Sequence, residues 1–156
     1  MIQEKLKNKG YRLPCRRSPT FNYLPVVVQN NLAYVSGQLP WDDTSSSLIR
    51  GKLGSEITVE IGRKAARRCV LSGLSVLLDA VGDFQIINRV VKISGFVASA
   101  PGFNKQPLVI DAASELLVEL FGENGRHARS AIGVCELPRG SAVEIEFLFS
   151  LLEHRS

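Results

Sequence analysis

Three charged side chains near the end of the chain are the first candidates for chemistry: Arg129, Glu144 and Glu146. They lie in residues 125–149, which we interpret as two β-strands joined by a Leu-Pro-Arg-Gly turn, since proline sets one turn dihedral and glycine permits the next. The other positions of these strands are apolar or small. Charged residues are rarely placed within a sheet without a use, so this predicted hairpin is the first place to look for a functional site.

Strand periodicity indicates which side chains of the predicted hairpin share a face. Arg129 is expected on one face with small residues of its strand: Ala131, Gly133 and Cys135. On the second strand Glu144 and Glu146 share a face. The opposite face of that strand is apolar: Val143, Ile145, Phe147 and Phe149. The pattern therefore places an arginine on one strand and two carboxylates on its expected partner.

The remaining elements must position this hairpin. We expect a short helix over residues 2–9, a β-hairpin within 23–38 that turns at Gln29-Asn30-Asn31, a helix capped by Ser55 or Thr58 that ends at Gly82, a strand over 86–97, and a helix between Pro107 and Gly122. Residues 12–19 and 42–55 are expected to form loops. Gly37, late in the first hairpin, can expose its backbone N–H to a group close by.

This order of elements, β-β-α-β-α-β-β, predicts a mixed sheet with two helices on one face, a two-layer α+β fold. With 156 residues, 45% of them hydrophobic, the chain can bury a continuous core, and we expect one domain over 1–156 with a short N-terminal extension over 1–20. The uncovered sheet face is expected to carry apolar side chains, including Phe or Val residues of the last strand. A monomer would leave them in water, so we expect self-association through the sheet.

Charge and hydropathy narrow the classes of function. A net charge of +4 suits anionic small molecules or weak contact with nucleic acid, and decides between neither. We interpret the basic side of the first long helix as a solvated face, because no aromatic residues interleave for base stacking: Arg63, Lys64, Arg67 and Arg68. No apolar run approaches the ~20 residues that span a bilayer, and the N-terminus lacks the apolar core of a signal peptide, so we expect a cytoplasmic protein that makes no membrane contact.

The cysteines point to no metal or redox chemistry. Cys15, Cys69 and Cys135 are odd in number and match no ligand or redox spacing, and only two histidines, His127 and His154, could assist them. We expect free, buried thiols in a reducing compartment and no metal centre.

Several short motifs, taken in order, resemble the RidA/YjgF family. They are Tyr23, Val35-Ser36-Gly37-Gln38-Leu39-Pro40, Ala128-Arg129-Ser130, Glu136-Leu137-Pro138 and Val143-Glu144-Ile145-Glu146. Their order and the expected topology match that family over nearly the whole chain. The segment from His127 to Val134 and the N-terminal extension resemble a divergent branch of it. The family also carries older names, L-PSP endoribonuclease and translation inhibitor.

The resemblance implies a chorismate-mutase-like fold assembled as a homotrimer, with pockets at the subunit interfaces. For the RidA branch it implies hydrolysis of 2-imino acids, or their 2-enamine tautomers, to 2-oxo acids and ammonia, without a cofactor. The partner would then be a small carboxylate metabolite.

In that chemistry each motif residue has an expected role. Arg129 would hold the substrate carboxylate in two parallel hydrogen bonds. Glu144, with a pKa raised by partial burial and by Glu146, would hold and polarise the attacking water. Tyr23 would close the pocket. Other positions implied at the substrate are Ser36, Gly37, whose backbone N–H would add a donor, Ala131 and Asp111.

Two positions depart from the family pattern. Many RidA-like proteins have a cysteine two residues after the arginine, where this chain has Ala131, so a covalent thiol there is impossible. Related sequences often place Asn-Gly before the second helix, where this chain has Asp111-Ala112. If Asp111 reaches the pocket, its charge would oppose an anionic substrate. Both changes bear on the range of substrates.

Each assignment also has a structural alternative. Arg129 could pair only with Glu144 or Glu146 to satisfy buried charge, Glu146 is expected in a subunit salt bridge, and Tyr23 could serve only in packing. His127 is expected to be a surface histidine whose cationic form is disfavoured by the neighbouring arginines.

Three hypotheses of function follow. The first is an imine or enamine deaminase, and the second is a trimeric module that binds a carboxylate metabolite without turning it over. A ribonuclease is third, because an acid/base pair would have to come from His127 and His154.

Overall fold

The computed structural model describes residues 1–15, 19–42 and 47–153. The predicted loops over 12–19 and 42–55 therefore lie partly outside the described residues, and His154 lies wholly outside them. The helices are α1 (Ile2–Asn8), α2 (Val59–Val81) and α3 (Gln106–Phe121), with 3-10 turns η1 (Phe84–Ile86), η2 (Gly122–Gly125) and η3 (Pro138–Gly140). The strands are β1 (Val26–Gln29), β2 (Leu32–Gln38), β3 (Ile87–Ala98), β4 (Ala128–Val134) and β5 (Val143–Leu151).

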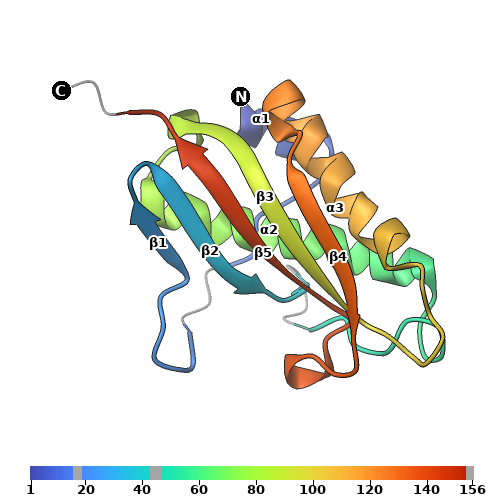
Figure 1. Cartoon of the computed structure of the whole chain (residues 1–156). Coiled ribbons are helices and arrows are strands. Elements are labelled where there is room, and N and C mark those ends of the chain that lie inside the picture. The colour runs from blue at the N-terminus through green and yellow to red at the C-terminus, as the bar shows by residue number, and fades with distance from the viewer. Residues whose placement is uncertain (16–18, 43–46, 154–156) are drawn as a thin grey trace.

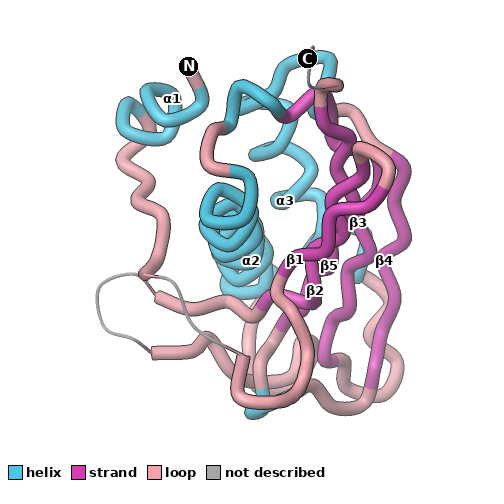
Figure 2. The backbone as a smooth tube through the Cα atoms, turned by 90° about the vertical axis from the view of Figure 1, so that its left-hand side faces the viewer, coloured by secondary structure: helices cyan, strands magenta, loops and turns pink. Residues whose placement is uncertain are grey.

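The five strands form one mixed sheet in the order β1-β2-β5-β3-β4, in which only β3 and β4 run parallel. The helices lie on one face of this sheet, and the other face is left open, as the edge-on view shows (Figure 2). The two-layer α+β architecture expected from the sequence is confirmed.

Most of the predicted elements have the expected local causes. Asn30 and Asn31 both adopt positive φ in the turn between β1 and β2, which is the backbone that a tight hairpin requires. Thr58 caps α2 by accepting a hydrogen bond from the Ile61 N–H, and Gly122 ends α3 with positive φ. The first helix packs on α3, where Leu6 is buried.

The predicted hairpin of residues 125–149 is wrong, although both of its strands exist. Figure 1 shows β3 lying between β4 and β5, and β3 pairs with both of them. The reason is the connection through α3: a strand, a crossover helix and a second strand place the two strands parallel and side by side. The chain then passes through η3 and enters β5 on the far side of β3.

The apolar face of β5 packs against the helices, which corrects the expected composition of the open face. Val143, Ile145, Phe147 and Phe149 are all buried in the core. At Gly73 of α2 a Cβ would meet the Phe147 ring, so this glycine lets the helix approach the sheet closely. The open face has different apolar side chains, set by the strand registers: Tyr34, Phe96, Ile132 and Leu148.

The cysteines and the basic helix face differ from expectation in part. Cys69 is free and buried as expected, whereas Cys15 and Cys135 are free but exposed, because both lie outside the helices and strands that enclose the core. Arg63 and Arg67 of α2 pair with Glu115 of α3 at 2.8 and 3.4 Å, so part of the basic side of α2 joins the two helices.

Candidate functional site

Arg129 lies on the edge strand β4 and points to the helix side of the sheet. Its register partner on β3 is Ile93, which is fully buried beneath the helices. The Arg129 Nη1 donates to Asp111 Oδ1 at 3.1 Å and to Ser114 Oγ at 3.2 Å, both on α3. The structural alternative, in which Arg129 pairs with Glu144 or Glu146, is therefore wrong for the single chain.

Ser114 connects Arg129 to a histidine. The Ser114 Oγ lies 3.0 Å from His127 Nε2, and His127 Nδ1 lies 2.6 Å from the Gly125 carbonyl oxygen. A carbonyl oxygen only accepts, so Nδ1 carries the proton and the neutral Nε2 accepts from the serine hydroxyl. That leaves the lone pairs of Ser114 Oγ free to accept from Arg129. We call Asp111, Ser114, His127 and Arg129 the arginine cluster.

His127 is not the surface histidine that the sequence suggested. It is half-buried, and both ring nitrogens are hydrogen-bonded. Burial is the main cause that lowers its pKa, and the Arg129 charge lowers the pKa further, whereas the Gly125 carbonyl opposes the change. The expectation that the cationic form is disfavoured is thus confirmed, with burial as the larger cause.

Both positions that depart from the family pattern lie on the helix side of the sheet. Asp111 is in the second turn of α3, so it does not precede that helix as assumed, and it reaches Arg129 across the gap to β4. Ala131 shares the helix side of β4 with Arg129 and packs against the core.

A second group of predicted residues lies near β2, toward the edge of the sheet opposite β4. A hollow of about 230 Å³, which we call the β2 hollow, opens beside the end of β2. It is lined by Pro19, Thr20, Tyr23, Pro25, Gly37, Gln38, Leu39, Trp41, Val76 and Arg139. Tyr23 is 53% exposed, so it lies at the rim and is not a packing residue of the core.

Ser36 holds the segment that carries Tyr23. Its Oγ donates to the Leu24 carbonyl at 2.7 Å, and its N–H donates to the Pro25 carbonyl at 2.9 Å. Both bonds fix the approach of the chain to β1, and therefore the position of the tyrosine.

Glu144 lies against Gly37 on the open face. A Cβ at position 37 would overlap the Glu144 carboxylate, so only glycine lets the glutamate lie over β2. Partial burial raises the Glu144 pKa, and the nearby Glu146 raises it further, which confirms the expectation from sequence. Gly37 lines the β2 hollow, and a carboxyl group with a raised pKa against that glycine is suited to take and return a proton.

These two groups cannot form one pocket within a single chain. The Glu144 register partner is Phe96 on the open face, whereas Arg129 pairs with Ile93 on the helix face. Strand β4 is also three strands away from β2, which is about 14 Å at ~4.8 Å per strand.

Two residues of the β2 hollow, Trp41 and Arg139, were not among the predicted site residues. The Arg139 guanidinium carbon lies 6.0 Å from the centre of the Trp41 ring, and its backbone adopts φ +59°. The Pro-Arg-Gly turn is the signal that could have indicated this conformation, since the turn holds a side chain away from the sheet. A cation at the rim makes the hollow more favourable for an anion.

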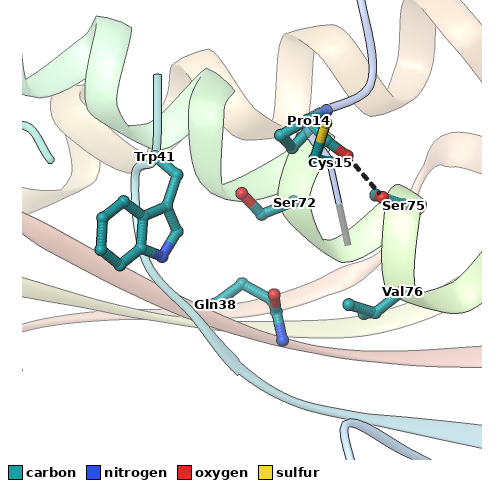
Figure 3. A pocket seen from close by; sticks show the side chains of 7 residues that line it. All are labelled: Pro14, Cys15, Gln38, Trp41, Ser72, Ser75 and Val76. Carbon is teal, nitrogen blue, oxygen red and sulfur yellow. Dashed lines mark hydrogen bonds between the residues drawn. The ribbon is translucent and has the colours of Figure 1, made fainter. Parts of the chain in front are cut away.

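A smaller cavity lies beside the β2 hollow and shares Gln38, Trp41 and Val76 with it. Figure 3 shows its wall on α2, where Ser75 Oγ donates to the Pro14 carbonyl at 2.8 Å. Its volume of about 40 Å³ accommodates water but not a metabolite.

Within residues 1–15, 19–42 and 47–153, no helix is long and apolar enough to cross a membrane. In the same ranges, no three His, Cys, Asp or Glu side chains gather closely enough to hold a metal ion.

Comparison with known proteins places this architecture in a family. Residues 3–152 match the family model described as "YjgF/chorismate_mutase-like, putative endoribonuclease". The chain therefore belongs to the YjgF family, the one that its motifs resemble.

Relatives of known name and structure agree with this assignment. The chain is 42% identical to Protein TCP17 of Trypanosoma cruzi over 96% of its length and 94% of that protein. It is 30% identical to the human 2-iminobutanoate/2-iminopropanoate deaminase, over 80% of its length and 76% of the human protein. The crystal structure of Atu1372 from Agrobacterium tumefaciens, a protein of unknown function, aligns with a TM-score of 0.88 at 40% identity, covering 96% of this chain and 93% of that one.

Proposed function

We propose that the protein is a cofactor-free hydrolytic deaminase that converts 2-imino acids or 2-enamines to 2-oxo acids and ammonia. The observation that carries the proposal is the state of Arg129. Its side chain is 26% exposed, and Nη1 is held by Asp111 and Ser114. Among the described residues Nε and Nη2 have no partner, so two donors of a fixed guanidinium remain for a carboxylate.

The chemistry needs water, one proton carrier and a fixed substrate. With the carboxylate on Arg129, the water oxygen bonds to the imine carbon while Glu144 takes a proton from that water. Glu144 then returns the proton to the nitrogen, which gives a carbinolamine. Glu144 next takes the hydroxyl proton and passes it to the nitrogen as the carbonyl forms, and the carbon–nitrogen bond breaks to release ammonia and the 2-oxo acid. Since the uncatalysed reaction is easy, positioning and charge stabilisation supply enough of the rate.

The complete site on this proposal is made by neighbouring copies of the chain. Because Arg129 and Glu144 lie on opposite faces and far apart, Arg129 of one subunit would approach Tyr23, Gly37 and Glu144 of the next. A closed homotrimer meets this requirement with three equivalent sites. Its inner surface would cover the apolar side chains of the open sheet face.

The direct test adds the protein to a dehydratase that releases a 2-imino acid, and follows ammonia and 2-oxo acid. We expect wild type to accelerate their release, Arg129→Ala to remove the acceleration, and Arg126→Ala to keep it. Arg126 is the matched control, because it is an exposed neighbour that pairs only with Glu123 among the described residues. Equal rates for wild type and Arg129→Ala would reject the proposal.

A binding module without turnover is the second candidate, and Ala131 and the Asp111–Arg129 pair favour it. Alanine removes a thiol from the site, and the ion pair reduces the attraction of Arg129 for an anion. In that case a 2-oxo acid would raise the melting temperature of wild type but not of Arg129→Ala, while imine decay stays unchanged.

A ribonuclease has less support, because both ring nitrogens of His127 already form hydrogen bonds, to Ser114 and to Gly125.

A further inference from the structure

Resting on the proposed role of Arg129, we propose that Asp111 makes the arginine cluster selective for ligands that carry an N–H group next to their carboxylate. The ligand class is the zwitterion of a small 2-imino or 2-amino acid, and the disfavoured class is the 2-oxo acid. Asp111 would accept from the ligand nitrogen while Arg129 donates to the ligand carboxylate.

The first argument is charge. Arg129 and Asp111 form an ion pair at 3.1 Å, so the two formal charges cancel. His127 adds no charge near neutral pH, because burial and Arg129 lower its pKa. Glu115 is paired with Arg63 and Arg67, and Arg126 is paired with Glu123. A neutral cluster attracts a zwitterion as well as it attracts an anion, and net charge gives the anion no advantage.

The second argument is the arrangement of donors and acceptors. Only Oδ1 of Asp111 and Nη1 of Arg129 are used in their contact. Within the described residues this leaves Oδ2 of Asp111 as an unused acceptor, beside the unused Nε and Nη2 donors of Arg129. Asp111 is 50% exposed, so a ligand can reach it. The pair thus offers an acceptor for N–H groups beside donors for a carboxylate.

The chemistry of the ligands completes the argument. In a protonated 2-imino acid or a 2-amino acid, N–H donors are one carbon away from the carboxylate, which complements this pair. In a 2-oxo acid the same position holds a carbonyl oxygen, whose lone pairs would face the carboxylate of Asp111. Such a cluster would hold the substrate of the proposed reaction more tightly than its product, which favours product release.

The test measures the affinity of two ligands with the same carbon skeleton, 2-aminobutanoate and 2-oxobutanoate, by titration calorimetry. Wild type is expected to bind 2-aminobutanoate more tightly by about threefold to fivefold, the range of a partly exposed charge contact. Asp111→Asn keeps an oxygen for Arg129 but loses the charge, and should lose this preference and bind 2-oxobutanoate more tightly than wild type does. Glu115→Gln, a control at another exposed α3 carboxylate in an ion pair, should behave as wild type.

Each outcome bears on one proposal or on both. An unchanged ratio of affinities in Asp111→Asn, with binding still lost in Arg129→Ala, overturns this inference and leaves the proposed function in place. Binding of both ligands that survives in Arg129→Ala overturns the proposed function. No binding of either ligand to wild type overturns both.

Discussion

The arginine cluster and the Gly37–Glu144 contact differ in how their charged groups are compensated. In the arginine cluster an ion pair, a serine and a neutral histidine satisfy one another, and only the outer atoms of Arg129 and Asp111 stay available. At Gly37, Glu144 is partly buried beside a second carboxylate, and its pKa is raised. The first region therefore holds a permanent charge in a fixed position, whereas the second has a carboxyl group that can gain and lose a proton more readily.

Their placement makes the two regions complementary. One lies at the β4 edge on the helix side, and the other lies over β2 on the open side. Arg129, the proposed carboxylate ligand, and Glu144, the proposed proton carrier, therefore lie in different regions. The comparison therefore predicts that each region is half of a site, completed by another copy of the chain.

The first prediction places the two halves of the site on different chains. Arg129→Ala and Glu144→Gln chains should each be inactive alone. When the two are co-expressed with different affinity tags and purified through both tags, activity should return to about a third of wild type, since each mixed trimer joins the two intact halves in one of its three sites. The measurement is ammonia release in the dehydratase assay. Activity in the mixture no greater than in the single variants would mean that the halves do not meet.

The next effect concerns how Glu144 is held. Gly37→Ala should lower activity about 10²-fold, because the new Cβ displaces the carboxylate from its position. Stability should change by less than about 1 kcal/mol, since only the end of a flexible side chain must move. Gly73→Ala is the contrasting variant: its Cβ meets the buried Phe147 ring, so it should cost about 1–3 kcal/mol in urea unfolding. Wild-type activity in Gly37→Ala would mean that the reaction does not depend on the position of Glu144 over β2.

The sequence predicted the local parts of both regions better than their relation. Alternation along β5 correctly separated Glu144 from Phe147, and the like-charged Glu146 correctly indicated a raised pKa for Glu144. Turn chemistry at Asn30 and Asn31 was also sufficient, because positive φ is a property of those residues themselves. These features depend on contacts close in the chain.

What the sequence did not predict depends on contacts made across the fold. The turn before β5 resembled a hairpin turn, but β4 pairs in parallel with β3 because α3 connects these two strands as a crossover helix. That one topological difference moved Arg129 to the face opposite Glu144. It also placed Asp111 and Ser114, 18 and 15 residues earlier in the chain, against the guanidinium. No periodicity in the sequence encodes such a distance.

Ser114 is expected to contribute to substrate binding by orienting Arg129. Ser114→Ala removes the acceptor that orients Arg129, and the loss of one hydrogen bond of about 0.5–1.5 kcal/mol should raise KM about threefold to tenfold. Because the proton carrier is elsewhere, kcat should change little. Ser114→Thr keeps the hydroxyl and should stay near wild type. Loss of kcat with an unchanged KM in Ser114→Ala would place the serine in the chemical step instead.

The smallest effect is the contribution of His127 to stability as pH changes. Its pKa in the folded chain is lowered from the ordinary value of 6.5, so between these two values the unfolded chain binds the proton and the folded chain does not. Unfolding is then favoured as pH falls, and the melting temperature of wild type should drop below about pH 6.5. His127→Gln should flatten this part of the curve. Arg129→Ala should flatten it only in part, because burial, the larger cause of the lowered pKa, remains. A curve for His127→Gln that is parallel to wild type would mean that His127 protonates freely in the folded chain, and the neutral tautomer that links Ser114 to Arg129 would then be lost.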